Sequence, residues 1–378
     1  MNQEDNILNS LALNLIDGMT PLRQHALLEH FGSANELFDV PLSEIAKING
    51  PVGENLGSQQ KRDDAFRRAE KELQFALSHG IEILTLDNNK YSQRLSQCCD
   101  APTVLYKLGY QDLNKKRFIS IVGTRHATPY GKDVTRHIVG ELAKHDRDIV
   151  IVSGLAYGVD IEAHRAAMDF GLNTIAVLAH GLDRIYPPLH RQDAVKITNG
   201  HGALVTEFPS LTDPVANNFL QRNRIIAGLS DVTIVVESAE KGGSMSTARL
   251  AVEYNRELFA VPGRLYDKNS AGCNRLIAGY KAEIFTSVDD LFTKMNWVDE
   301  LEPELPFIKE ESLQLTGIQA KIVNLIKENG ALQINAIAQM MDESFAEISS
   351  TLGEMLFNDI VQQLPGDVYD LSFELKNK

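Results

Sequence analysis

Glycines that stand beside a hydroxyl, an amide or a cationic side chain recur directly after several short apolar runs of this sequence. In a turn from a strand into a helix, glycine lets backbone N–H groups face an anion, and the helix N-terminus adds a favourable dipole. An arginine in such a turn adds a planar set of donors that suits phosphate. The residues that this pattern selects as candidate phosphate ligands are Gly123, Thr124, Arg125, Ser153, Gly154, Lys241, Gly243, Ser244 and Asn274.

A second group of candidate ligands lies close together at residues 219–224. Arg222 and Arg224 are further candidate phosphate donors, and Asn223 between them is a candidate to hold a base or a loop. Phe219 is the aromatic residue that we favour for stacking on a base. Surface salt bridges remain the alternative interpretation of the arginines, and a core position remains the alternative for Phe219.

Asp160 and His164 are four residues apart and would share one face of a helix. A hydrolytic or metal site is one interpretation of this pair. The sequence offers no evident third ligand, so helix capping and packing is the other interpretation. The sequence also lacks the GxxxxGK[ST] pattern, the GxGxxG fingerprint with a ribose-binding acid, and the GxSxG pattern. We therefore expect no cofactor, no metal and no catalytic residue.

The elements that must position these residues are strands that alternate with helices from residue 80 onward. The short apolar runs that we expect to be strands are Ile81–Leu86, Phe118–Val122, Ile149–Val152, Thr174–Leu178, Ala203–Thr206, Val232–Val236 and Leu258–Val261. Apolar runs without polar alternation are typical of strands buried on both faces of a parallel sheet. Amphipathic helices are expected between them at Lys132–His145, Ile161–Phe170 and Ser246–Tyr254. The sequence therefore predicts a Rossmann-like, doubly wound α/β sheet, in which ligands gather beyond the carboxyl ends of the strands.

Helical segments flank this predicted sheet on both sides along the chain. Residues 1–80 predict a small helical domain of the SAM or helix-hairpin-helix kind, and residues 81–296 form the Rossmann-like domain. Residues 297–312 are acidic and contain proline, which is typical of a linker. Residues 313–378 show three helices followed by a hairpin, the winged-helix pattern. The third of these helices has no Lys or Arg, so we expect it to contact protein or to be structural and not to read DNA.

The charge of the chain limits how it could bind a polyanion. Net charge is −14, but residues 85–296 hold 25 Lys and Arg against 23 Asp and Glu. A nucleic-acid site would therefore be a local pocket and not a broad basic face. No apolar run approaches the length of about 18 residues that spans a membrane, the N-terminus is acidic, and the three cysteines fit neither a disulfide framework nor a zinc site. We expect a cytoplasmic protein without membrane contact.

Eight ordered motifs of the central segment closely resemble the DNA-processing protein A (DprA/Smf) family. They are IVGTR (121–125), SGLAYGVDIEAH (153–164), TIAVLAHGLDRIYP (174–187), TEFP (206–209), NFLQRNRIIAGLS (218–230), GGSMSTARLA (242–251), FAVPGR (259–264) and GCNRLIAGYKA (272–282). The resemblance is dense over residues 80–295, and the helical and winged-helix segments match the family's three-part architecture more loosely. Four positions depart from the family pattern, namely Ala179, Leu220, Ser246 and Tyr280.

The resemblance implies a single-stranded DNA-binding recombination mediator that protects incoming DNA and helps to load a RecA-type recombinase during natural transformation. It also implies a homodimer through the Rossmann-like domain and no enzymatic activity. The DNA-contacting residues that it implies are those of the GTR, RNR and GS motifs, which match Gly123, Thr124, Arg125, Arg222, Asn223, Arg224, Gly243 and Ser244; Lys241 is added from its position alone.

An enzyme is the alternative hypothesis. Related Rossmann-like domains with a similar Gly-Gly-hydroxyl loop hydrolyse nucleoside monophosphates at the bond between base and ribose. Such a reaction needs a carboxylate close to the sugar, and Glu237 or Glu253 is a candidate for it. A third possibility is an interaction scaffold in which the acidic winged helix carries the main activity.

Overall fold

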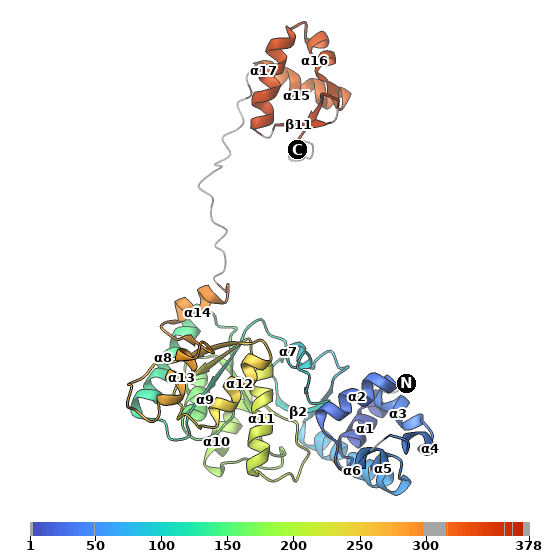
Figure 1. Ribbon diagram of the computed structural model, residues 1–378, viewed down its shortest axis with the longest axis vertical. Helices are drawn as coiled ribbons and strands as arrows, with labels where there is room; N and C mark the ends of the chain where they lie inside the picture. The colour runs from blue at the N-terminus through green and yellow to red at the C-terminus, as the bar shows by residue number, and fades with distance from the viewer. Residues whose placement is uncertain are drawn as a thin grey trace. The chain divides into compact units, whose positions relative to one another are not determined.

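The chain divides into two compact units, Met1–Trp297 and Val298–Lys378. The structure is a computed structural model that describes residues 3–48, 50–297, 315, 317–358, 360–364 and 366–372. Each unit is considered by itself (Figure 1). Within the described residues, no helix is both long enough and apolar enough to cross a membrane.

A nine-stranded sheet forms the centre of the first unit, and its strands follow the order β1-β2-β6-β5-β4-β3-β7-β8-β9. The strands are β1 (Glu82–Thr85), β2 (Val104–Gly109), β3 (Phe118–Val122), β4 (Val150–Ser153), β5 (Asn173–Val177), β6 (Gly202–Thr206), β7 (Val232–Val235), β8 (Glu257–Ala260) and β9 (Glu283–Ile284). From β6 to β9 all neighbours are parallel, while β1 and β2 pair antiparallel. The predicted doubly wound sheet is confirmed, with an antiparallel extension that the sequence did not predict.

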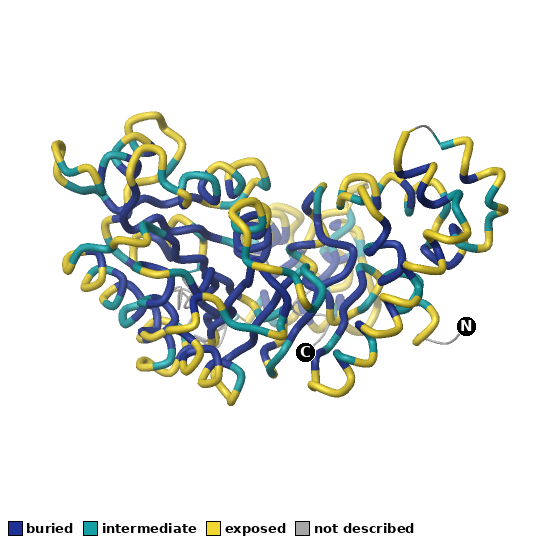
Figure 2. The backbone as a smooth tube through the Cα atoms, turned by 90° about the horizontal axis from the view of Figure 1, so that it is seen from below, coloured by how far each residue is buried: buried dark blue, intermediate teal, exposed yellow. Residues whose placement is uncertain are grey.

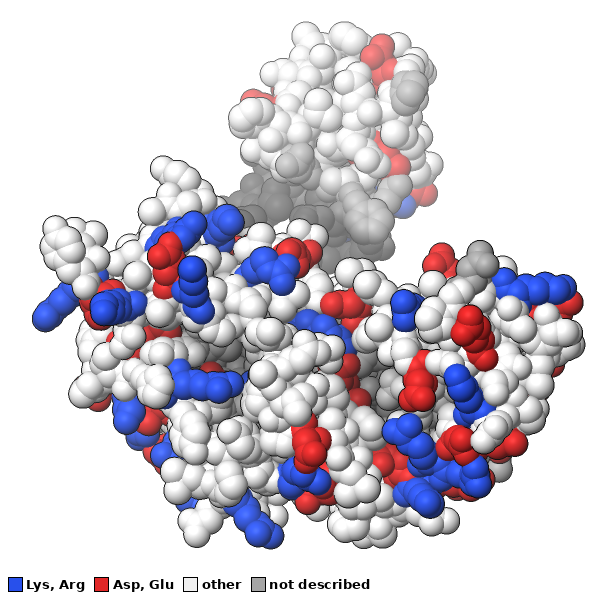
Figure 3. Space-filling view, turned by 60° about the horizontal axis from the view of Figure 1, so that its bottom comes forward, with Lys and Arg blue, Asp and Glu red and all other residues white. Residues whose placement is uncertain are grey.

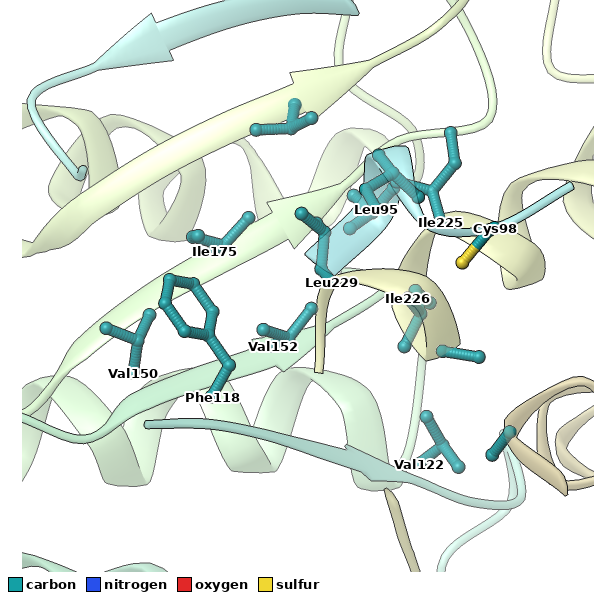
Figure 4. Close-up of a cluster of buried hydrophobic side chains, with 14 of the residues drawn as sticks. Leu95, Cys98, Phe118, Val122, Val150, Val152, Ile175, Ile225, Ile226 and Leu229 are labelled. Carbon is teal, nitrogen blue, oxygen red and sulfur yellow. The ribbon is translucent and has the colours of Figure 1, made fainter. Parts of the chain in front are cut away.

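Helices cover both faces of the sheet because successive side chains of each strand point to opposite sides. Phe118 and Val122 belong to the core beneath α11 (Ala216–Leu229), α12 (Ser244–Glu253) and α13 (Ala271–Ala278). Figure 4 shows α11 residues lying over side chains of β3 and β4. The opposite core lies beneath α8 (Pro129–His145), α9 (Val159–Asp169) and α14 (Val288–Lys294). Apart from the exposed edge strand β9, the strands are therefore mostly buried segments between partly exposed helices (Figure 2).

The strand order reverses direction at β3. From β3 the chain proceeds through β4, β5 and β6 on one side, and through β7, β8 and β9 on the other. The loops that leave β3 and β7 therefore diverge to opposite faces and open a crevice at the carboxyl ends of these strands. This switch point is where open α/β sheets bind their ligands.

The N-terminal helices pack against the antiparallel end of the sheet (Figure 1). They are α1 (Gln3–Asn14), α2 (Pro21–Phe31), α3 (Ala34–Asp39), α4 (Leu42–Ile45), α5 (Pro51–Leu56) and α6 (Gln59–His79). Their core includes Leu11, Leu37 and Leu56 and continues without a break into Ile83 of β1 and Tyr106 of β2. The helices and the sheet thus belong to one compact unit, and a domain boundary at residue 80 stays a prediction.

The described residues of the second unit form three helices and a three-stranded antiparallel sheet. Its elements are α15 (Gly317–Asn329), β10 (Leu332–Gln333), α16 (Ile334–Met341), α17 (Phe345–Phe357), β11 (Val361–Leu364) and β12 (Val368–Leu371). This is the expected order of three helices and a hairpin, to which the structure adds the short strand β10. The predicted linker 297–312 lies outside the described residues except for Trp297, and the winged-helix assignment stays a prediction.

Candidate anion-binding pocket

A pocket of about 680 Å³ lies at the switch point of the sheet. The loops after β3, β4 and β7, the start of α12 and the first turns of α11 form its walls. The sequence-predicted ligands that line it are Gly123, Thr124, Arg125, Phe219, Arg222, Asn223, Gly243 and Ser244. The other predicted ligands, Ser153, Gly154, Arg224, Lys241 and Asn274, do not line it.

Arg125 is the exposed cation of this pocket. Its guanidinium lies over the ring of Phe219 at 5.0 Å from the ring centroid. It has no ion pair or hydrogen-bond partner for its side chain among the residues that the structure describes. The backbone before it is held firmly, because Thr124 donates its N–H to the carbonyl of Glu237 at 2.7 Å. Arg125 is therefore a positioned guanidinium that is free to bind an anion.

The N-terminus of α12 faces the same pocket. The backbone N–H groups of Gly243 and Ser244 have no acceptor among the described residues. Asn223 fixes this turn from α11, because its Nδ2 donates to Ser246 Oγ at 2.8 Å and to Gly243 O at 3.4 Å. Of the two roles expected for Asn223, holding a base or holding a loop, the structure shows the second. Two free amides and a helix dipole add a second anion-binding group.

Arg222 forms a buried wall of the pocket and is held by backbone carbonyls. Its Nη1 donates to Gly154 O at 2.6 Å and to Val177 O at 2.5 Å. Burial lowers the pKa of Arg222 to about 10, opposed by the nearby carboxylate of Asp160. A Cβ on Gly154 would collide with Arg222 Nη1, so this glycine makes room for the guanidinium. Both Gly154 and Arg222 therefore build the pocket.

Arg224 points away from the pocket. Its guanidinium donates to the carbonyl of Asp100 and forms a buried ion pair with Glu207. The reason is the helix itself, since residues two apart on α11 are rotated by about 200° around its axis. The RNR motif thus sends its two arginines to opposite sides, and only Arg222 reaches the switch point.

Three other predicted ligands lie beside the pocket in supporting positions. Ser153 is buried and donates its hydroxyl to Ile121 O at 2.7 Å. Asn274 exchanges two hydrogen bonds with the backbone of Gly263 and so fixes the loop after β8. Lys241 is exposed on the loop that precedes the lining residues of α12. None of the three contacts the pocket interior.

Tyr186 is a pocket residue that sequence reasoning missed. Its side chain is 40% exposed and lines the pocket, and its ring lies 5.8 Å from that of Phe219 at an interplanar angle of 58°. The rings of Tyr186 and Phe219 together form the aromatic wall of the pocket. The tyrosine lies in the motif at 174–187, but that motif did not mark it as a base-stacking candidate, because its place depends on how the loop 179–186 returns over the sheet.

The carboxylates near the pocket are buried or already bound. Asp160 lines the pocket, and burial raises its pKa. Glu237 accepts hydrogen bonds from the N–H and hydroxyl of Thr128 at 2.9 and 2.6 Å, and Thr128 is the N-cap residue of α8. His164 is fully buried between Thr174 and Leu155, and burial lowers its pKa to about 3. His164 therefore has the packing role, and within the described residues no group of His, Cys, Asp and Glu is arranged for a metal.

A larger pocket of about 940 Å³ lies beside β1 and β2 and differs in character. Its two lysines, Lys107 and Lys90, both pair with Glu82, at 2.6 and 2.9 Å, so neither cation is without a carboxylate partner. Figure 3 shows basic and acidic side chains interspersed over the visible face of the first unit, without a broad basic surface. In the part of the chain that the structure describes, the switch-point pocket accordingly brings together a cation without an ion-pair partner and two backbone amides without an acceptor.

Comparison with known proteins points to one family. The family model for DNA recombination-mediator protein A matches residues 82–296. The chain is 33% identical over 302 residues to a putative DNA processing protein DprA of Mycobacterium tuberculosis, covering 76% of this chain and 77% of that one. It is 41% identical over 217 residues to the DNA processing protein DprA of Bacillus subtilis, covering 57% and 72%.

Two solved structures resemble the fold at appreciable sequence identity. DNA processing protein A from Streptococcus pneumoniae superposes with a TM-score of 0.64 at 30% identity, covering 76% of this chain and 97% of that one. DNA processing protein A from Helicobacter pylori, whose structure is described for its single-stranded DNA binding mode, gives a TM-score of 0.52 at 33% identity and covers 57% and 96%.

Proposed function

This chain belongs to the DNA recombination-mediator protein A family, and from that premise we propose that it binds single-stranded DNA in the switch-point pocket. The observation that carries the proposal is Arg125, an exposed guanidinium that stacks on Phe219 at the pocket and has no ion-pair partner among the described residues. The single-stranded DNA binding mode described for the Helicobacter pylori relative favours the same ligand here.

The phosphate contacts in this proposal come from Arg125 and from the free amides of Gly243 and Ser244. Gly123 and Thr124 shape the turn that presents Arg125, while Lys241 adds attraction from the rim. Such donors contact the backbone and do not read base edges, so binding is largely independent of sequence and weakens with salt.

The remaining predicted ligands are assigned supporting roles. They hold the backbone around the pocket or, in the case of Arg224, pair with a carboxylate on the far side of α11. These supporting residues are Ser153, Gly154, Arg222, Asn223, Arg224 and Asn274.

The aromatic wall gives a reason for preferring single strands. Bases of a single strand can stack on exposed aromatic rings, whereas bases in a duplex are already stacked and paired. The pocket of about 680 Å³ offers Tyr186 and Phe219 beside Arg125. One nucleotide thus finds a phosphate donor and a stacking surface within the same pocket.

Fluorescence anisotropy with a labelled oligo-dT tests this function. The oligonucleotide should have about 20 nucleotides, because a single-strand-binding module typically covers about 4–16 nucleotides. We expect saturable binding that a random single strand competes and that a duplex of equal length competes much less. Equal competition by the duplex, or no binding to oligo-dT at low salt, would contradict the proposal.

A mediator role is proposed as the purpose of this binding. In it the protein protects single-stranded DNA that enters the cell and helps to load a RecA-type recombinase during natural transformation. The supporting observation is membership of a family described as recombination mediators. The test is whether the protein shields oligo-dT from a nuclease and speeds recombinase assembly on DNA that a single-strand-binding protein covers.

We propose that the protein acts without catalysis. The carboxylates considered for nucleoside-monophosphate hydrolysis are engaged elsewhere, because Glu237 accepts two hydrogen bonds from Thr128 and Glu253 pairs with Arg249 on the surface of α12. Asp160 is the acidic residue that lines the pocket within the described part of the chain. Incubation with AMP tests the alternative, since release of adenine with turnover would favour the enzyme.

Homodimerisation through the Rossmann-like domain also belongs to this proposal. Its support is an exposed sheet edge, where β9 presents Ile284 and the preceding turn presents Tyr280, which is 99% exposed. Sedimentation equilibrium tests the proposed dimer. The wild-type protein should sediment as a dimer, and the double variant Tyr280→Asp, Ile284→Asp should sediment as a monomer, because the two introduced carboxylates repel each other across the interface. We also propose that the protein is cytoplasmic and that its acidic C-terminal unit contacts other proteins.

A further inference from the structure

A buried carboxylate of the N-terminal helices contacts the loop that forms one rim of the pocket. Glu72 lies on α6 and is only 7% exposed. Its two oxygens accept hydrogen bonds from Ser210, one from the N–H at 2.7 Å and one from the hydroxyl at 2.5 Å. Ser210 belongs to the outer rim loop, residues 207–215, which joins β6 to α11. Two charge-assisted hydrogen bonds fix both the position and the orientation of this loop.

The outer rim loop in turn holds the inner rim loop, residues 179–186. Leu211 donates its N–H to the carboxylate of Asp183 at 2.9 Å. A Cβ on Gly181 would lie 2.5 Å from the carbonyl oxygen of Pro209, so the two backbones are in direct contact. A displacement of one loop would therefore disturb its contacts with the other.

Both loops lead directly to the aromatic wall. Tyr186 is the last residue of the inner rim loop, and Phe219 lies in the first turn of α11, which begins at Ala216. The ring of Phe219 supports the guanidinium of Arg125 at 5.0 Å. A displacement of the outer rim loop would change where the aromatic wall stands relative to Arg125.

We propose that Glu72 is a positioning residue for single-stranded DNA binding, which sets the aromatic wall through Ser210 without touching the DNA. The inference rests on the proposed function, since it concerns how the same pocket accepts a base. It gives the helical region a defined part in the site. The role differs from a purely stabilising contact because it acts on base stacking. The backbone that presents Arg125 is held independently of the rim loops, since Thr124 donates its N–H to the carbonyl of Glu237, so the phosphate contacts should be largely kept.

The test uses the full chain and two oligonucleotides of equal length, oligo-dT and a strand of abasic sites. Glu72→Ala removes both acceptors, so we expect roughly 5- to 50-fold weaker binding of oligo-dT, the range for losing part of one base stack. Binding of the abasic strand, which has phosphates but no bases, should stay within about twofold of wild type. Glu70→Ala is the matched control, because Glu70 is exposed on the same helix and has no described contact with the rim.

Rescue and exchange measurements separate positioning from loss of the fold. Glu72→Gln keeps an oxygen for the Ser210 N–H, so it should recover most of the lost affinity. Ser210→Ala removes only the hydrogen bond from the hydroxyl to Glu72. If Glu72→Ala fails to fold, the affinities of Ser210→Ala for oligo-dT and for the abasic strand are compared in its place. Hydrogen exchange of the outer rim loop should speed up in Glu72→Ala and remain slow in Glu70→Ala.

Two results would overturn the inference. One is wild-type affinity for oligo-dT in a folded Glu72→Ala protein, and the other is an equal loss of affinity for oligo-dT and the abasic strand. A wild-type protein that binds no oligo-dT is a different failure. It would overturn the proposed function itself, and this inference with it.

Discussion

Replacing Arg125 with alanine should weaken binding of single-stranded DNA strongly without weakening the fold. The guanidinium is exposed and pairs with no carboxylate in the described chain, so its removal leaves no buried charge behind. A hydrogen bond to a charged group contributes about 1.5–3 kcal/mol, which corresponds to about 10- to 150-fold in affinity. The free energy of unfolding should change by no more than about 0.5 kcal/mol, as for other surface substitutions.

The salt dependence of binding makes this prediction specific to a phosphate group. For single strands, the slope of the logarithm of affinity against the logarithm of salt concentration becomes shallower by about 0.7 for each phosphate that the protein no longer neutralises. Arg125→Ala should show that change in anisotropy titrations from low to moderate salt. Arg125→Lys keeps the charge but not the planar group that stacks on Phe219, so we expect the wild-type slope with intermediate affinity.

The matched control for Arg125 is Arg249→Ala. Arg249 is an exposed arginine of the same unit, paired with Glu253 on α12 and absent from the pocket lining. A similar loss of affinity in both variants would show that general charge and not the pocket attracts the DNA. An unchanged salt slope in Arg125→Ala would likewise refute the proposal that this residue binds a phosphate.

Three further predictions concern stability and modularity. Arg222→Met should lower the free energy of unfolding in urea by about 3–5 kcal/mol, because two buried carbonyls lose their donor and the buried carboxyl of Asp160 loses a nearby positive charge; wild-type stability would contradict the buried role. The pKa of His164 is lowered to about 3 from 6.5, so the unfolded chain binds the extra proton between these values. Stability contributed by the neutral ring is present above pH 6.5 and is lost as pH falls, by up to about 1.4 kcal/mol per unit, and His164→Gln should flatten that slope in urea titrations. Deleting residues 298–378 should leave affinity for oligo-dT within about twofold, since the pocket lies wholly in the first unit; a larger loss measured by anisotropy would implicate the second unit in binding.

The location of the site was predictable because of how parallel strands appear in a sequence. Strands buried on both faces form continuous apolar runs, and each run ends where its loop begins, so Gly123 to Arg125 could be placed at a strand end. The side of a helix on which a residue lies was not predictable in the same way. Arg222 and Arg224 look equivalent in sequence, yet α11 buries one at the pocket and pairs the other with Glu207.

The edges of the sheet were predicted less well for a related reason. β2 contains Lys107 and ends in Gly109, so it is not a continuous apolar run. β9 has only Glu283 and Ile284, both exposed, and a strand this short leaves no pattern. Tyr186 escaped prediction because a loop residue reaches the pocket only through contacts between the rim loops, which are distant in sequence.

The small number of free cations has a consequence for how an acidic protein holds a polyanion. One exposed arginine and two amides give each pocket only a few phosphate contacts, and a net charge of −14 opposes long-range attraction. A single pocket of this kind binds modestly in physiological salt. Tight binding would follow if one strand occupied two pockets of a dimer, because the second contact becomes intramolecular and the two affinities reinforce each other. On this reasoning, tight binding of DNA requires the proposed dimer, because each pocket has too little positive charge to hold a DNA strand tightly by itself.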